Sequence, residues 1–272
     1  MGVVNFNGVS TNSSKFSAPI LVETPPDYTF PSRDANFTHV PGRDGDVLVD
    51  NGSYNNVTRT YNLAIGDEDI DYARLAYELS DWLHSANGYA KLTDSYDPEH
   101  YCMAAFIDEG SIVNILQHAG RISVSFNCKP QRYLISGDKK INVLELPGTN
   151  YKKLVNPTRF WARPLIHVHT VNNLPTTIEI SRVYSEVHDS DPLSNQSITI
   201  TPNTSYPHLY IDSELMDCYS VDETTWPHTI INRNSDVVFS KSVFPILKSG
   251  LLYFEHDSGI NMLEVTPRWW TI

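Results

Sequence analysis

Residues 67–88 contain the only long helical repeat in a sequence otherwise rich in strand and turn signals. Its apolar stripe, spaced by three or four residues, consists of Tyr72, Leu75, Leu79 and Leu83. Ala76 and Trp82 widen the stripe. We predict a helix from about Asp67 to Ser85, with Asn87-Gly88 as a left-handed stop.

The first turn of this predicted helix is acidic, as the helix dipole favours. Its acidic residues are Asp67, Glu68, Asp69 and Asp71. A single amphipathic helix cannot bury its stripe alone, so it must pack on a sheet. The flanking segments 56–65 and 90–107 have strand character and are the expected partners.

Strand and turn signals alternate on the N-terminal side of the helix. We expect a strand over 33–40, a turn at 41–45, a short return over 47–49 and another turn at Asn51-Gly52. The strand that follows presents one face, formed by Val57, Arg59, Tyr61, Leu63 and Ile65. Arg59 on an apolar face is expected to be paired or to extend its charge toward water.

Beyond the helix, 89–93 and 101–107 are expected strands, joined by a turn over 94–98. The segment 114–119 is compatible with a short turn of helix or an irregular link. Residues 122–128 (ISVSFNC) alternate apolar and polar side chains without a break. This alternation predicts a strand with one buried face and one wetter face.

The composition changes between 136 and 157, where lysines cluster among glycine and proline. We place a domain boundary there, giving domains 1–135 and 136–272. The second domain is expected to contain short strands at 164–170, 177–182, 197–201, 209–212, 237–239, 251–256 and 261–266. Regular short strands with polar turns favour an antiparallel β-sandwich. The adjacent Trp269 and Trp270 are expected to dock into a core or an interface.

Charge and composition exclude several classes of protein. The chain of 272 residues carries a net charge of −12, and no strongly basic stripe interrupts it, so sequence-specific nucleic-acid binding is not expected. No stretch approaches the roughly 18 apolar residues of a membrane span. The N-terminus lacks the features of a signal peptide, so the six Asn-x-Ser/Thr matches are attributed to chance.

The three cysteines, Cys102, Cys128 and Cys218, are far apart and lack CxxC spacing. We expect reduced, mostly buried thiols, in keeping with assembly in a reducing cytoplasm. His167-x-His169 places two rings on one face of a strand, but two ligands do not make a zinc site. No metal or cofactor is therefore predicted.

No arrangement of residues requires an enzyme. The acidic turn of Asp94, Asp97 and Glu99 could perform acid–base chemistry, but these residues are also ordinary turn formers. The chain has no G-x-S-x-G, P-loop or G-x-G-x-x-G motif. We therefore predict a protein that is not an enzyme, with no catalytic residues.

Six blocks together resemble the distal tail (Dit) proteins of siphophages, particularly those of Gram-positive hosts. They are VPGRDGDVLVDNGSYNNVT (40–58), LTDSYDPEHYCMAAF (92–106), ISVSFNCKPQRYL (122–134), YIDSELMDCY (210–219), FPILKSG (244–250) and EVTPRWW (264–270). The blocks follow the family's order and span nearly the whole chain. No block is specific by itself, and the series carries the resemblance.

The resemblance implies a mainly β fold: an α+β belt domain with one helix, then a galectin-like antiparallel β-sandwich. It also implies a virion structural protein of the phage tail tip, assembled in the host cytoplasm. Such proteins form a homohexameric hub ring. The ring joins the tail tube protein to the tail-associated lysin or fibre, and in some phages to receptor-binding baseplate proteins that serve host adsorption.

Two departures limit what the resemblance implies for sugar binding. Sugar-binding galectins have a His-x-Asn-Pro-Arg strand, whereas 156–159 is Asn-Pro-Thr-Arg, without the preceding histidine. Trp226 is followed by Pro227, where galectins have glycine. The galectin-like fold alone therefore does not predict sugar binding.

A ring requires a contact between neighbouring copies, for which the sequence offers one candidate. We predict a contact through the hairpin residues Pro41, Gly42, Arg43, Asp44 and Gly45, against the alternative of a solvent-exposed turn. Genome DNA would pass through the lumen of the ring. The protein itself is not expected to insert into a membrane. Acidic residues lining the lumen would repel its phosphates.

Two other functions stay open at this level. The C-terminal sandwich could be a carbohydrate-binding module for host saccharide, with Trp226, Tyr206 or Tyr210 as an exposed platform. A glycoside hydrolase would need two carboxyl groups roughly 5 to 9.5 Å apart across a cleft. Glycan binding and turnover on host cell wall distinguish these functions from a structural hub.

Overall fold

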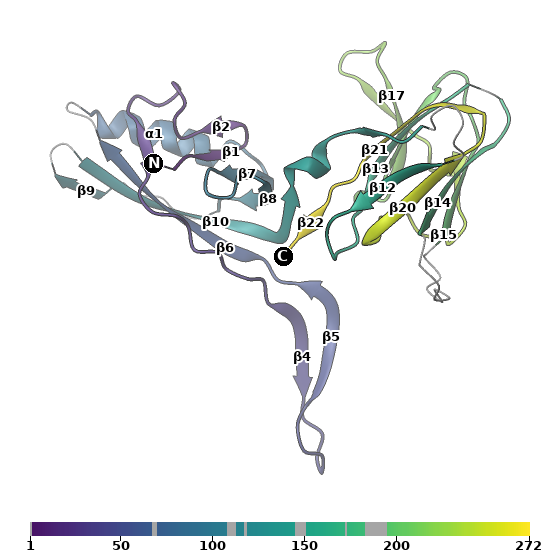
Figure 1. Cartoon of the computed structure of the whole chain (residues 1–272). Coiled ribbons are helices and arrows are strands. Elements are labelled where there is room, and N and C mark those ends of the chain that lie inside the picture. The colour runs from purple at the N-terminus through teal and green to yellow at the C-terminus, as the bar shows by residue number, and fades with distance from the viewer. Residues whose placement is uncertain are drawn as a thin grey trace. The chain divides into compact units, whose positions relative to one another are not determined.

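Figure 1 shows the computed structural model of the chain. The structure describes residues 2–66, 70–107, 113–116, 119–144, 151–171, 173–182 and 195–272. Residues 1–132, with Ile272, form one compact unit, and residues 133–271 form a second. We call them unit 1 and unit 2.

Unit 1 is built on a sheet whose neighbouring strands follow the order β2-β1-β7-β8-β10-β6-β3, with β9 beside β10. The strands are β1 (Val4–Phe6), β2 (Val9–Ser10), β3 (Ile20–Val22), β6 (Val57–Gly66), β7 (Ala90–Asp94), β8 (His100–Ala105), β9 (Val113–Leu116) and β10 (Ala119–Leu134). The pairs β1–β7, β7–β8, β6–β10 and β3–β6 are antiparallel. Residues 113–116 thus form a strand, so both the predicted turn of helix and the alternative irregular link are wrong for 114–116.

The predicted helix is present as α1 (Tyr72–Leu83); it ends within two residues of the predicted Ser85, but it begins later than the predicted Asp67. The side chain of Asp71 caps it by accepting a hydrogen bond from the Arg74 N–H at 3.1 Å. The helix ends at His84, whose N–H donates to the Ser80 carbonyl, so Asn87-Gly88 is not its stop. The predicted acidic residues Asp67, Glu68 and Asp69 lie outside the described residues.

The helix buries its stripe against the sheet. Leu75, Leu79, Trp82 and Leu83 are buried in one apolar cluster with side chains of β6, β7 and β8. Trp82 also donates its indole N–H to the carbonyls of Phe6 and Val9. Ala76, predicted to widen the stripe, is exposed instead. The helix therefore covers the core of unit 1, as its spacing predicts.

β6 and β10 form the longest ladder of unit 1. Their register pairs Val57 with Cys128 and continues to Gly66 opposite Ala119. The alternation in 122–128 is confirmed: Ile122, Val124, Phe126 and Cys128 are all buried. All three cysteines are free and buried, as predicted.

β4 (Arg33–Thr38) and β5 (Val47–Tyr54) form a separate two-stranded hairpin. Figure 1 shows it extending from the point where β6 begins, away from the sheet of unit 1. Asn51-Gly52 does not form the predicted turn. These residues lie inside β5, where the pairing shifts between Asp34↔Ser53 and Ala35↔Asp50. The result is a bulge, with Gly52 at a φ of 73°.

Unit 2 is a sandwich of two sheets, with strand orders β11-β21-β13-β16-β17-β18 and β12-β20-β14-β15-β19. Its elements are η1 (Ile135–Asp138), β11 (Ile141–Asn142), β12 (Lys152–Asn156), β13 (Leu165–Thr170), β14 (Thr176–Arg182), β15 (Asn195–Ile200), β16 (His208–Asp212), β17 (Asp217–Asp222), β18 (Thr229–Asn232), η2 (Asn234–Asp236), β19 (Val237–Phe239), β20 (Gly250–His256), β21 (Ile260–Thr266) and β22 (Trp270–Thr271). The predicted strands of this half are present within a residue or two, and the sequence missed β11, β12, β17, β18 and β22.

One apolar cluster contains residues of both sheets, including Ile166 of β13 and Phe254 of β20. The predicted mainly β fold with a C-terminal antiparallel sandwich is therefore confirmed. Trp269 is buried in this cluster, and Trp270 stacks on Phe160 with ring centres 4.4 Å apart. The described helices include none long and apolar enough to cross a bilayer.

Candidate functional surfaces

The predicted contact residues lie at the tip of the β4–β5 hairpin. Pro41, Gly42, Arg43, Asp44 and Gly45 are all exposed. Gly42 and Gly45 have φ values of 82° and 77°, and the Arg43 N–H donates to the Val40 carbonyl at 3.2 Å. The tip is a tight turn that the described part of the chain leaves uncovered. Its role as a contact stays a prediction.

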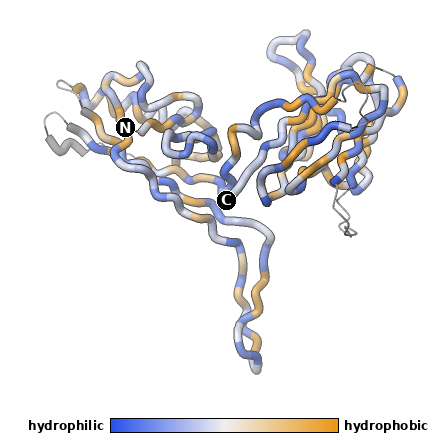
Figure 2. The backbone as a smooth tube through the Cα atoms, in the orientation of Figure 1, coloured by the Kyte–Doolittle hydropathy of each residue, from blue (hydrophilic) through white to orange (hydrophobic). Residues whose placement is uncertain are grey.

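The arms of the hairpin expose apolar side chains that the sequence analysis did not single out. Phe37 and Leu48 stand opposite each other across the two strands, with 72% and 54% of their surfaces exposed. Val49 on β5 is also exposed, as is Phe30 just before β4, and Figure 2 shows apolar segments along both strands. Exposure of these apolar side chains to water is unfavourable, and an isolated two-stranded hairpin is only marginally stable. The signal was present in the sequence as apolar residues flanking a turn.

The acidic turn has a structural use within unit 1. Asp94 is buried, and its Oδ1 accepts the N–H groups of Tyr96 and Asp97 at 2.9 and 3.0 Å. Its Oδ2 accepts the Tyr61 hydroxyl at 2.7 Å and lies 3.5 Å from the Arg59 guanidinium. The predicted pairing of Arg59 is confirmed. The fold thus uses this carboxylate to close a turn and neutralise a buried cation.

The two histidines of β13 meet a third one that the sequence analysis missed. His167 Nε2 lies 3.1 Å from Nδ1 of His208 on β16, and the rings of His169 and His208 are 4.4 Å apart. Glu264 on β21 lies 3.4 Å from His167 Nδ1. Across the described ranges, no group of three such side chains is arranged to hold a metal ion.

Burial lowers the pKa of His167, and the Glu264 carboxylate opposes this effect only in part. Burial also lowers the pKa of His208, helped by the charge of His169. Both imidazoles are therefore neutral at pH 7 and can each donate and accept one hydrogen bond. Their closeness follows from the register of β13 and β16, which no local sequence signal encodes.

A groove of about 410 Å³ opens beside these histidines, on the face of the six-stranded sheet away from the core. Its floor includes His167, His208 and Tyr210, and its walls include Tyr206 and Glu223. The volume falls in the range of about 300–1,000 Å³ that is usual for small-molecule sites. Of the three aromatic residues that the sequence suggested as a platform, Tyr206 and Tyr210 line this groove. Trp226 does not line it and is 88% exposed.

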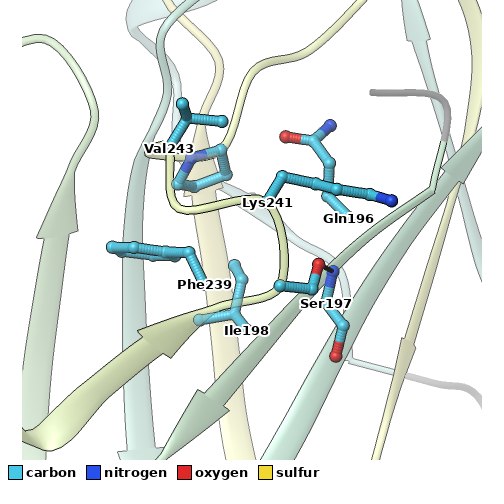
Figure 3. Close-up of a pocket in the computed structure, with 8 residues that line it drawn as sticks. Gln196, Ser197, Ile198, Phe239, Lys241 and Val243 are labelled. Atoms are coloured by element: carbon cyan, nitrogen blue, oxygen red, sulfur yellow. Dashed lines mark hydrogen bonds between the residues drawn. The ribbon is translucent and has the colours of Figure 1, made fainter. Parts of the chain in front are cut away.

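A second hollow lies on the other sheet, beside β15 and β19. Figure 3 shows Ser197, Ile198, Phe239 and Lys241 around it. It leaves no room for a water molecule, and the Gln196 carboxamide exchanges two hydrogen bonds with the main chain of Ile246 nearby. This hollow is a packing feature.

Asn156, which was compared with the asparagine of the galectin sugar motif, is also structural. It is 2% exposed, and its amide donates to the carbonyls of Phe160 and Leu247 at 2.9 and 3.0 Å. Its Oδ1 accepts the Thr158 N–H. These bonds pin the loop after β12 to the core.

The fold of the chain matches solved structures of phage proteins across almost its whole length. No family model matches the sequence, and no curated protein matches it. The Dit protein of phage SPP1, described as a paradigm of hub adsorption apparatus in Gram-positive infecting phages, has 10% identity and a TM-score of 0.66, with 97% of both chains covered.

A chain of the phage p2 baseplate, in its activated conformation with calcium, has 12% identity and a TM-score of 0.54, covering 97% of both chains. The strontium form has 10% identity and a TM-score of 0.53, covering 97% of this chain and 96% of the other. At these identities the likeness concerns the fold. The chain therefore has the mainly β fold of the phage SPP1 Dit protein and of a phage p2 baseplate component.

Proposed function

We propose that this chain is a distal tail protein of a siphophage. Six copies form a hub ring at the tail tip, which connects the tail tube to the structures that contact the host. The observation that carries the proposal is the fold match to SPP1 Dit over 97% of both chains. The six sequence blocks, which span nearly the whole chain, support the same proposal.

The β4–β5 hairpin supplies the contact between neighbouring copies in this proposal. Its exposed Phe37–Leu48 pair would be buried by the next subunit, which gains free energy from the apolar area removed from water. The tip, Pro41–Gly45, contacts the same neighbour. Arg43 and Asp44 at the tip offer one positive and one negative charge to that neighbour. A head-to-tail contact of this kind closes a ring when the rotation between neighbouring copies divides a full turn into a whole number of equal steps.

The partners follow from the position of the ring. The tail tube protein lies above it, and the tail-associated lysin or fibre lies below it. Receptor-binding baseplate proteins attach around it in some phages. The protein then belongs to the virion tail tip, is assembled in the host cytoplasm and has a structural rather than an enzymatic role.

The charge of the chain suits passage of the genome. A ring of six copies would carry six times −12, or −72, formal charges. Acidic residues facing the lumen would repel DNA phosphates and let the genome slide without binding. A basic lumen in a structure of the ring would contradict this part of the proposal.

Light scattering of the purified protein, with negative-stain images of the same fraction, tests the proposal. A mass near six times 30.8 kDa, together with rings that have a central hole, is the expected result. A chain that stays monomeric under all conditions and is absent from purified virions by mass spectrometry would contradict it. The double charge reversal Arg43→Glu, Asp44→Arg should weaken the ring if the tip contacts a neighbour.

A further inference from the structure

The groove of unit 2 has a floor made of aromatic rings in cross-strand register. His167 and Tyr210 are opposite each other on β13 and β16, and Tyr210 is opposite Tyr219 on β17. The ring centres are 4.1 Å apart in the first pair and 5.3 Å in the second, and the rings are nearly parallel. A continuous aromatic row therefore stands on the outer face of the sheet.

Buried polar contacts hold the walls around this floor. Arg233 is 3% exposed, and its guanidinium donates to the Tyr206 carbonyl and to Ser220 Oγ, both at 2.8 Å. Ser220 in turn donates to the His208 carbonyl. One buried cation thus ties the loop that carries Tyr206 to strands β16 and β17, so little order has to be gained when a ligand binds.

Several polar groups of the groove have no protein partner within the described part of the chain. They are the phenolic oxygens of Tyr206 and Tyr210 and the carboxylate of Glu223. Asp222 is different, because its Oδ1 accepts the N–H and hydroxyl of Thr224. The groove therefore offers both donors and acceptors to a guest molecule.

The electrostatics of the groove exclude anionic guests. No lysine or arginine is present among the described residues that line it, whereas Asp222 and Glu223 are acidic. His167 and His208 are neutral at pH 7 because burial lowers their pKa values. A phosphate or carboxylate would meet two carboxylates without a compensating cation.

We propose that this groove binds a neutral saccharide. A pyranose ring has an apolar C–H face, which suits aromatic carbon, and hydroxyl groups, which need both donors and acceptors. The ring of Tyr206 supplies the first, because the faces of Tyr210 are covered by His167 and Tyr219. The phenols of Tyr206 and Tyr210, the His208 imidazole and Glu223 supply the second, since both nitrogens of His167 are already engaged by Glu264 and His208. The site uses neither Asn156 nor Trp226, so it is independent of the galectin motif positions.

Titration calorimetry of the full chain with neutral methyl glycosides tests the proposal. The probes are the methyl glycosides of glucose, galactose, N-acetylglucosamine and rhamnose, with glucose 6-phosphate and choline as charged comparisons. At least one neutral glycoside should bind, and Tyr206→Ala and Glu223→Gln should each weaken its binding tenfold or more. Tyr151→Ala changes a partly exposed tyrosine of unit 2 outside the groove and should leave the affinity unchanged.

Three results would overturn the proposal: no binding of any neutral glycoside, tighter binding of glucose 6-phosphate or choline, or binding that survives Glu223→Gln and Tyr206→Ala. Glu223 is exposed, so its replacement tests the site without risk to the fold. Ring formation does not depend on this groove. Failure of the saccharide proposal would therefore leave the proposed structural role untouched.

Discussion

The hydroxyl of Tyr61 donates a hydrogen bond of 2.7 Å to Oδ2 of Asp94, and both side chains are buried inside unit 1. Burial raises the pKa of the Tyr61 phenol, and the neighbouring Asp94 charge raises it further. A raised pKa keeps the phenol in its protonated, hydrogen-bond-donating form at neutral pH. The same carboxylate compensates the buried Arg59, whose side chain is 8% exposed.

Removing Asp94 should therefore damage unit 1 severely. Asp94→Ala leaves Arg59 buried without a counter-charge, and we expect a loss of about 3–5 kcal/mol in unfolding free energy. Tyr61→Phe removes one donor and should cost about 1–3 kcal/mol. Chemical denaturation followed by fluorescence measures both.

Arg74→Ala is the matched control, since Arg74 pairs with Glu78 on the surface of α1 with 68% of its side chain exposed. Its cost should stay below about 0.5 kcal/mol. Equal losses for Asp94→Ala and Arg74→Ala would show that the buried pair contributes nothing special.

The Asp212–Arg268 pair should make unit 2 sensitive to acid. Arg268 donates two hydrogen bonds to the Asp212 carboxylate, at 2.6 and 2.8 Å. Burial by itself would raise the pKa of Asp212, but the bonds from Arg268 and from the Leu215 and Glu214 N–H groups outweigh it and lower the pKa. The stabilisation is thus fully present above the ordinary pKa of 3.8 and is lost as the pH falls below it.

Asp212→Asn tests this dependence. The variant should be less stable than the parent at pH 7, and this difference in stability should shrink as the pH falls below about 4. Melting curves recorded across this range measure it. A stability gap that is independent of pH would assign the loss to the hydrogen-bond geometry rather than to the charge.

The hairpin arms should matter for assembly and not for the folding of one chain. The double variant Phe37→Ser, Leu48→Ser removes exposed apolar surface, so the melting temperature of dilute protein should stay unchanged. Ring formation should weaken or disappear in light scattering. Tyr77→Ser on α1 is the matched control because Tyr77 is 75% exposed. Rings that tolerate the hairpin variant would show that the contact lies elsewhere.

Gly137 should not tolerate a side chain. A Cβ added there would lie 2.5 Å from the main-chain nitrogen of Trp269. The two segments cannot move apart freely, because the Arg268 N–H donates a hydrogen bond to the Gly137 carbonyl. Gly137→Ala should cost about 1–3 kcal/mol through forced displacement of the C-terminal strand. Gly88→Ala is the control, because a Cβ there meets nothing within 4 Å. Calorimetry should show a lower melting temperature for the first variant alone.

Local patterns in the sequence were enough to predict several elements of this fold. The spacing of Leu75, Leu79 and Leu83 predicted the helix, and the alternation of 122–128 predicted a half-buried strand. These signals act over a few residues, because a helical or extended backbone directs neighbouring side chains to defined faces. The same locality explains the errors at Asn87-Gly88 and Asn51-Gly52. Glycine marks a permissive backbone, but it does not say whether a turn, a bulge or no special conformation follows.

The tertiary structure alone decided which distant residues meet. Asp94 beside Arg59 depends on the folding of β7 against the core, and His208 beside His167 depends on the register of β16 against β13. The groove exists because three strands and two loops converge. Register and loop approach are set by the packing of whole sheets, and no short stretch of sequence contains that information. The sequence by itself thus determined the elements and their buried faces, and the packing of those elements decided the sites.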